Sequence, residues 1–240
     1  MIKQIFTEED FSALPEKGIE AGKIRALYNA YGAKYPFCRF YRQGDCYISC
    51  LDGAYVVCGE PEDTTELSQF LSVNGYIEIF CAEATADVLS GSLEAEKAEI
   101  FLMCFNSGSS AVQPDYAPSL SDVYSIVSEG FDIAFEPWYL DMSHRVRHGV
   151  TKCAVLDDRA ALVIQHDING EALISQVACR MDSRGKGYAS QLVVSAACSL
   201  ASSEVYVLCE EQLVPFYEKC GFSFLIKKYV LSRRAGSAIE

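Results

Sequence analysis

Six consecutive residues, Arg184-Gly185-Lys186-Gly187-Tyr188-Ala189, join two cations to two glycines where an apolar run gives way to a helical pattern. Residues 172–179 predict a buried strand, and apolar positions every fourth residue from Tyr188 to Leu200 predict a helix. The first amides of a helix have no partner within it, and glycines let a bulky anion approach them closely. The junction therefore predicts a phosphate-binding site. The alternative is an ordinary strand-to-helix turn with solvated basic residues.

A second motif follows further along the chain. Residues 205–209 form an apolar strand pattern, and the run from Leu213 to Lys219 is typical of a short helix closed by Gly221. The helix carries Phe216-Tyr217, and Gly221-Phe222 comes directly after it. Two strand-to-helix motifs in this order are far more specific than either motif alone.

Together these residues resemble the GNAT superfamily of acyl-CoA-dependent N-acetyltransferases. The family signature is Arg or Gln, two residues, Gly, one residue, then Gly or Ala, and Arg184, Gly187 and Ala189 match it. Phe216-Tyr217 with Gly221-Phe222 matches the later signature, and the resemblance covers about residues 113 to 232. The family often has Asn and Ala where this chain has Glu210 and Leu213, which puts in doubt the usual side-chain contact to the pantetheine arm.

The resemblance implies transfer of an acetyl group from acetyl-CoA to a primary amine by direct attack on the thioester. The pyrophosphate would lie on the amides of Gly185 to Ala189, and the pantetheine along residues 174–179. A backbone N–H near Val177 or Ala178 would polarise the thioester carbonyl. The expected cofactor-binding residues are Val177, Ala178, Cys179, Arg184, Gly185, Lys186, Gly187, Tyr188 and Ala189.

Catalytic residues are less well defined by the sequence. Tyr217 occupies the family's general-acid position, with a plain core aromatic as the alternative. Residues 136–149 predict a helix that begins at Glu-Pro and ends at Gly149, in a region that often lines the acceptor site in this family. Glu136, Asp141 and His144 are its candidates for a base or a substrate contact, and a water relay is the alternative.

The first half of the chain has an order of elements that repeats the second half. A helix, a strand meander with a turn at Asp52-Gly53, a helix capped by Asp63, and a strand follow one another before a further helix and strand. We expect an α/β fold with mixed α+β sheets in two tandem GNAT-like lobes, 1–110 and 111–240, the first of them degenerate. Residues 59–63 hold three carboxylates and a proline at its equivalent loop. An unrelated α+β domain is the alternative.

Composition bounds the function. The net charge of −13 argues against nucleic acid and mildly favours cationic substrates such as amines. Eleven cysteines without a C-x-x-C motif are expected to be reduced, and the three histidines give no zinc motif, so no metal is expected. Acidic residues near Met1 and the lack of a long apolar run predict a cytoplasmic protein that does not insert into membranes.

Two other classes of function stay open at this point. A non-catalytic acyl-CoA sensor or interaction module would bind CoA without turnover, and a Fem-type aminoacyl transferase or an N-myristoyltransferase would share tandem lobes. The acceptor, a small amine or a peptide, is set by variable loops that the sequence does not decode. The oligomeric state is equally open, and a homodimer is one of the alternatives.

Overall fold

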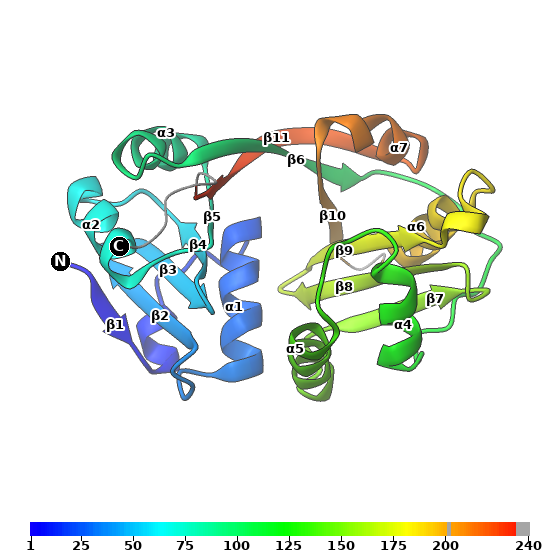
Figure 1. The fold of residues 1–240 in the computed structure, drawn as a ribbon, viewed down its shortest axis with the longest axis horizontal. Coiled ribbons are helices and arrows are strands. Elements are labelled where there is room, and N and C mark those ends of the chain that lie inside the picture. Colours follow the sequence, from blue (N-terminus) through cyan, green and yellow to red (C-terminus); the bar gives the residue numbers. More distant parts are fainter. Residues whose placement is uncertain (201–202, 234–240) are drawn as a thin grey trace. The chain divides into compact units, whose positions relative to one another are not determined.

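The computed structural model describes residues 1–200 and 203–233, which form two compact units. The first contains Met1–Ile100 and the segment from Lys227 onward, and the second contains Phe101–Ile226. The last seven positions of the lobe predicted over 111–240 lie outside the described residues. Figure 1 labels the helices and strands of both units.

Helices and strands are present in both halves of the chain. From the N-terminus to the middle they are β1 (Lys3–Ile5), α1 (Ile19–Tyr31), β2 (Cys38–Gln43), β3 (Cys46–Leu51), β4 (Ala54–Cys58), α2 (Thr64–Asn74), β5 (Glu78–Cys81), α3 (Glu83–Ser92) and β6 (Glu96–Phe105). The remainder are α4 (Leu120–Val127), α5 (Phe135–Arg147), β7 (Lys152–Leu156), β8 (Ala160–Ile168), β9 (Glu171–Cys179), α6 (Tyr188–Ser199), β10 (Glu204–Cys209), α7 (Val214–Lys219) and β11 (Phe222–Ser232).

Local sequence chemistry explains several of these boundaries. Asp52 and Gly53 have φ of 47° and 86°, which gives the tight turn predicted between β3 and β4. The carboxylate of Asp63 accepts a hydrogen bond from the amide of Glu66, so the predicted cap of α2 is confirmed. Gly75, at φ 73°, ends that helix.

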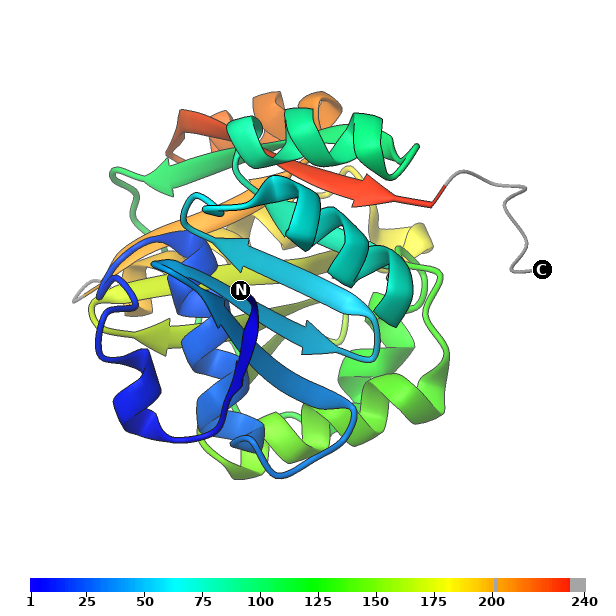
Figure 2. The ribbon, with the colours of Figure 1, turned by 90° about the vertical axis from the view of Figure 1, so that its left-hand side faces the viewer.

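In the first unit the sheet is covered on both faces. Adjacent residues of a strand point to opposite faces, and Tyr41 and Ile48 pack with Leu67 of α2. Their neighbours Phe40 and Tyr47 pack instead around the ring of Phe11. Figure 2 faces this unit and shows β1 at the edge of its sheet.

In the second unit, too, adjacent residues of a strand pack on opposite faces of the sheet. Leu162 and Ile164 of β8 pack with Leu192 and Ala196 of α6 in one core cluster. The alternate residues of β8 pack with α4 and α5 in another cluster, which includes Trp138. Because β8 is apolar on both sides, it is held between two helical layers.

Each sheet is completed by a strand from the other half of the chain. In the first unit the order is β1-β2-β3-β4-β5-β11, with β4 parallel to β5 and β11 antiparallel to β5. In the second unit the order is β6-β10-β9-β8-β7, with β9 parallel to β10 and β6 antiparallel to β10. The strand that follows α3 therefore serves the second unit, and the strand that follows α7 serves the first.

The cysteines are all free thiols, and eight of them are buried, seven of these within strands. Burial raises the pKa of several of these thiols, for example that of Cys153 to about 12. They therefore act as small apolar residues of the core. In the part of the chain that the structure describes, no helix combines the length and the apolar character needed to cross a bilayer.

Candidate functional site

The strand-to-helix junction predicted from the sequence is built as an open helix start. Gly187 precedes the first residue of α6 with φ 86°, and Gly185 has φ 74°, two left-handed conformations that favour glycine. The first helical hydrogen bond runs from the amide of Gln191 to the carbonyl of Gly187 at 3.0 Å. Gly187 has no side chain to cap the helix, so the amides that follow it are available to an anion.

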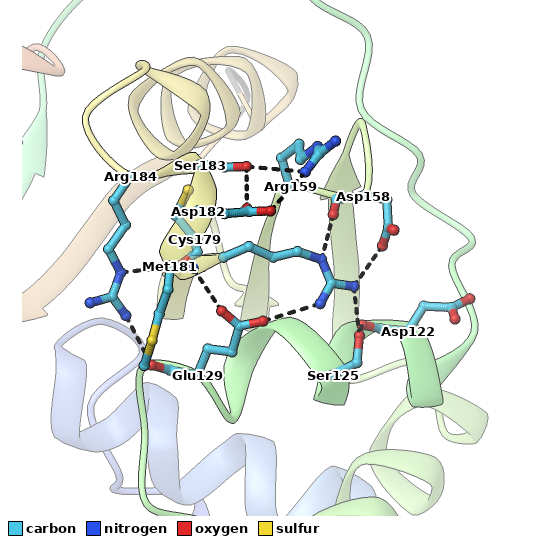
Figure 3. Close-up of polar contacts among 11 residues, drawn as sticks. Asp122, Ser125, Glu129, Asp158, Arg159, Cys179, Met181, Asp182, Ser183 and Arg184 are labelled. Carbon is cyan, nitrogen blue, oxygen red and sulfur yellow. Dashed lines mark hydrogen bonds and ion pairs between the residues drawn. The ribbon is translucent and has the colours of Figure 1, made fainter.

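The two cations of the loop are tied to backbone carbonyls. The guanidinium of Arg184 donates to the carbonyl of Cys179 at 3.3 Å and to that of Glu129 at 2.9 Å. The ammonium of Lys186 donates to the carbonyl of Asp182 at 2.8 Å. Figure 3 shows Arg184 reaching back across the loop toward Glu129. Arg184 therefore holds the loop in place as well as giving it positive charge.

A second arginine, which the sequence analysis did not identify, fixes the start of the loop. Arg180 donates to the carboxylates of Glu129 at 3.2 Å and Asp158 at 2.9 Å, and to the hydroxyl of Ser125 at 3.0 Å. Its hydrogen bond with Asp158 raises the pKa of Arg180. The other carboxylate oxygen of Glu129 accepts from the amide of Met181 at 2.7 Å. Glu129 thus connects the end of α4 to the loop (Figure 3).

The side of the loop is held by a smaller network. Arg159, in the turn between β7 and β8, donates to Asp182 at 3.4 Å and to Ser183 at 3.3 Å. Ser183 is buried and donates to the carboxylate of Asp182 at 2.7 Å. This hydrogen bond is the main cause that lowers the pKa of Asp182.

Strand β9 carries an irregularity next to this loop. Between the pairs Val163↔Ser175 and Ala161↔Ala178 the register with β8 shifts, and Gln176 there has φ 47°. The side-chain oxygen of Gln176 accepts a hydrogen bond from the indole nitrogen of Trp138 at 2.9 Å. Trp138 is buried, so α5 supports the bulge from beneath.

The neighbouring strand β10 stops pairing with β9 just before this bulge. Their described register begins at Glu171↔Glu204 and ends at Ile174↔Val207, while β9 continues to Cys179. β10 instead stays paired with β6 to its last residue. The end of β9 therefore has one edge turned toward open space rather than toward a neighbouring strand.

A cavity of about 620 Å³ occupies this space. Its walls come from the end of β9, from the loop and first turn of α6, and from α7. The lining residues are Gly130, Val177, Ala178, Cys179, Ser183, Arg184, Gly185, Gly187, Tyr188, Ala189, Ser190, Leu213, Phe216, Tyr217 and Lys219. The structure thus brings together Tyr217 and eight of the nine expected cofactor residues, the exception being Lys186.

Tyr217 is a lining residue with a strongly perturbed environment. It is only 6% exposed, and burial raises the pKa of its phenol well above the ordinary value of tyrosine. The neighbouring thiols of Cys209 and Cys220 act in the same direction. Tyr217 is therefore a neutral hydroxyl that holds its proton firmly at one wall of the cavity.

The acceptor-site candidates lie on α5. Glu136 is exposed in its first turn, and Asp141 accepts a hydrogen bond from Arg145 at 2.7 Å. His144 is half-buried with its ring 4.2 Å from that of His148. None of these three lines the cavity among the described residues, so their catalytic roles stay predictions.

The departure from the family pattern also lies at this site. The carboxylate of Glu210 accepts a hydrogen bond from the side-chain amide of Gln212, and Leu213 lines the cavity. Sequence reasoning did not select Phe216 and Lys219 as lining residues, although both flank Tyr217 in the quoted motif. Gly130, just after α4, carries no sequence signal of its own.

The fold is that of known acetyltransferases. An acetyltransferase of the GNAT family from Colwellia psychrerythraea aligns over 97% of this chain and 98% of its own, at 13% identity and a TM-score of 0.56. A GCN5-related N-acetyltransferase from Kribbella flavida aligns over 91% and 95%, at 11% identity and a TM-score of 0.57. A Drosophila protein aligns over 96% and 98%, at 11% identity and a TM-score of 0.67.

These similarities confirm the predicted GNAT-like fold over nearly the whole chain. At such low identities they show the fold alone. No protein-family model and no curated protein matches the sequence. Within residues 1–200 and 203–233 no group of His, Cys, Asp or Glu side chains is placed to hold a metal ion.

Proposed function

We propose that the protein transfers an acetyl group from acetyl-CoA to a primary amine. The observation that carries this proposal is the single cavity that joins an uncapped helix start at one end to the edge of β9 and a buried tyrosine at the other. A long, polyanionic thioester has the chemistry to fill such a cavity. The GNAT-like fold supports the same reaction class.

Each part of the cavity has a role in this proposal. The amides of Gly187 to Ala189 bind the pyrophosphate, because they point outward from the positive end of α6. The free edge of β9 at Val177 and Ala178 gives N–H groups along the pantetheine arm and beside the thioester oxygen. The Arg180–Glu129 pair keeps both parts at a fixed spacing.

Tyr217 is the proposed general acid. The amine forms a C–N bond to the thioester carbon, the C–S bond breaks, and the phenol gives its proton to the departing thiolate. Since burial raises the pKa of Tyr217, the phenol is protonated at neutral pH and ready for this step. The proton that the amine loses goes to water or to a base, for which Glu136 and His144 are the candidates.

The acceptor is a small primary amine or a peptide amine. The net charge of −13 supports a cationic acceptor, because an acidic surface attracts it. The eleven free thiols support a reducing location such as the cytoplasm. The matching order of elements in the two units supports descent of the first unit from a degenerate lobe of the same kind.

The first test is calorimetric titration of the purified protein with acetyl-CoA. The parent is expected to bind at micromolar concentration, and an Arg184→Glu/Gly187→Glu variant is expected not to bind. A Lys152→Glu/Gly170→Glu variant is the matched control, since it makes the same charge change and also replaces a glycine of positive φ, Gly170 at 75°. If the folded parent binds neither acetyl-CoA nor longer acyl-CoAs, the proposal is wrong.

A second function, acyl-CoA sensing without turnover, is favoured by one observation. Leu213 lines the cavity where the family often has alanine, and Glu210 stands in place of asparagine. A larger apolar side chain at that wall changes how a pantetheine arm is held. A sensor would bind CoA and be indifferent to loss of the Tyr217 hydroxyl.

A further inference from the structure

Gly130 is a glycine that its backbone conformation does not require. It is exposed directly after α4 and lines the large cavity. Unlike Gly185 and Gly187, it does not have a left-handed φ. A Cβ atom at Gly130 would lie 3.5 Å from the Cβ of Ala178 and 3.8 Å from the carbonyl oxygen of Val127, which are ordinary contacts. Neither the backbone nor the packing therefore explains why this position carries no side chain.

The missing side chain leaves space over Ala178. The Cβ of Ala178 is the nearest atom to the place that a side chain at Gly130 would take, and it is only a methyl group. Ala178 belongs to the end of β9, where the strand pairs with β8 and no longer with β10. A larger residue at position 130 would therefore fill the cavity beside the free edge of β9.

The segment that carries Gly130 is fixed on both sides. The amide of Gly130 donates to the carbonyl of Val127 at the end of α4, at 3.0 Å. The carboxylate of Glu129 accepts from the amide of Met181 at 2.7 Å, and its carbonyl accepts from Arg184 at 2.9 Å (Figure 3). The space over Ala178 is thus preformed, and a ligand that fills it does not have to order its wall.

The charges beside this space are positive. Among the described residues that line the cavity, the charged side chains are Arg184 and Lys219, both of them cations. Arg184 is bound to the residue directly before Gly130. Apolar surface in the same cavity comes from Val177, Leu213 and Phe216. Because like charges repel, the space suits an apolar chain better than the ammonium group of an acceptor.

We propose that Gly130 is a specificity-determining residue that gives the site room for acyl groups longer than acetyl, such as butyryl. This inference rests on the proposed function, which puts the thioester beside Ala178. The acyl chain extends from the thioester carbon into the space between Gly130 and Ala178, where it gains apolar contacts and leaves water. The substrate class is then the short-chain acyl-CoA thioesters, of which acetyl-CoA is the smallest.

Three ligands that share the same CoA part test the space: CoA, acetyl-CoA and butyryl-CoA. By calorimetry, the parent is expected to bind butyryl-CoA about tenfold more tightly than acetyl-CoA, because two further methylene groups are buried. CoA reports the contacts of the pyrophosphate and the pantetheine arm, which all three ligands have in common.

Gly130→Val fills the space and is expected to weaken butyryl-CoA about tenfold or more, because its chain loses its place. CoA and acetyl-CoA are expected to stay within about twofold of the parent, since the substituted position is exposed. Gly91→Val is the matched control and is expected to change no affinity. Gly91 is exposed in α3, also lacks a left-handed φ, does not line the cavity, and has no atom within 4 Å of an added Cβ.

Gly130→Ala adds only a Cβ atom and serves as the second variant if Gly130→Val does not fold. It is expected to weaken butyryl-CoA about threefold, since about one methylene group of space is lost. Gly91→Ala is its control. A loss that grows from alanine to valine would support the inference, because the affinity then follows the space that is filled.

Each outcome decides between the two proposals. Equal affinity of the parent for acetyl-CoA and butyryl-CoA would overturn the inference and leave the proposed function intact. Equal loss of CoA and butyryl-CoA in Gly130→Val would also overturn it, because the space would then belong to the pantetheine arm. Unchanged affinity for all three ligands in that variant would overturn it as well and leave the space to the acceptor. Failure of the folded parent to bind any of them would overturn the proposed function, and this inference with it.

Discussion

The two units differ at the junction where a strand leads into the helix that connects it to its parallel neighbour. In the first, β4 leads through residues 59–63 into α2, and α2 leads to the parallel neighbour β5. In the second, β9 leads through residues 180–187 into α6, and α6 leads to the parallel neighbour β10. One helix start is closed by the protein's own groups, and the other is left open.

The closed start belongs to α2. The carboxylate of Asp63 accepts the amide of Glu66 at 2.9 Å, and Gln43 donates to the carbonyl of Asp63 at 3.1 Å and to the carboxylate of Glu66 at 2.6 Å. The amide of Ile2 also donates to Glu66, at 2.8 Å. The positive end of α2 is thus neutralised within the unit.

The open start belongs to α6, where Gly187 contributes no capping side chain. A good cap stabilises a helix by about 1 kcal/mol, and the second unit does without this stabilisation. The strands that lead into the two helices also differ. The β3–β4 ladder has no shift in register, whereas the β8–β9 ladder is interrupted at Gln176. At this junction, groups that cap the helix stabilise it but occupy its first amides. An uncapped helix lacks that stabilisation and leaves its first amides available to a ligand.

Closing the open start is expected to have the largest effect. Gly187→Asp puts a carboxylate on the amides of α6, as Asp63 does on α2, and is expected to weaken acetyl-CoA about a hundredfold through lost contacts and repulsion. Calorimetry measures the change. Gly170→Asp, at a glycine of φ 75° outside the cavity, controls for backbone strain. Unchanged affinity in Gly187→Asp would break the comparison.

Removing the phenol at the other end of the cavity separates catalysis from binding. Tyr217→Phe is expected to lower kcat about a hundredfold, as is common for loss of a general acid, with acetyl-CoA affinity unchanged. Release of free thiol, followed in an amine screen, gives kcat. An undiminished kcat, once an acceptor is known, would favour water as the acid.

The pH dependence of the parent sharpens the same prediction. A general acid works in its protonated form, and the raised pKa of Tyr217 keeps that form present as the pH increases. We therefore expect no loss of kcat from this group between pH 7 and about 10, the ordinary pKa of tyrosine. A decline that Tyr217→Phe abolishes would contradict the buried environment.

A smaller effect is expected beneath the bulge. Trp138→Phe removes the indole donor to Gln176 and is expected to lower the free energy of unfolding by about 2 kcal/mol. The end of β9 then loses its support, so acetyl-CoA is expected to bind several times more weakly. Urea unfolding and calorimetry measure the two changes, and Tyr139→Phe on the same helix is the control. An unaltered affinity would show that the bulge at Gln176 does not contribute to acetyl-CoA binding.

The smallest effect on the site is expected from opening the closed start. Asp63→Ala removes the cap of α2 and is expected to lower the free energy of unfolding by about 1 kcal/mol. Acetyl-CoA affinity is expected to stay the same, because the first unit does not supply the loop. Urea unfolding measures the stability, and a change of affinity would show that both junctions take part.

The features recovered from the sequence are those fixed by neighbouring residues. The turn at Asp52-Gly53, the cap at Asp63 and the helix start at Tyr188 each depend on the chemistry of a few adjacent positions. The grouping of Tyr217 with the loop was found because two local motifs occur in a familiar order.

The features that the sequence did not reveal depend on distant partners. Arg180 and Glu129 are separated by 51 positions, and nothing in either segment identifies the other. The left-handed Gln176 is held by Trp138, from another element, and glutamine itself gives no signal of that conformation. The pairing of β6 with β10 is equally hidden, because apolar strands specify a face but not a neighbour.

The exchange of end strands has a consequence for how the chain matures on the ribosome. The edge of β5 receives β11, whose residues are synthesised long after those of β5. Until then the N-terminal half exposes an unpaired strand edge, which is a template for wrong pairing. The first unit is incomplete without this strand, so a nascent chain finishes the sheet of that unit only after β11 has emerged.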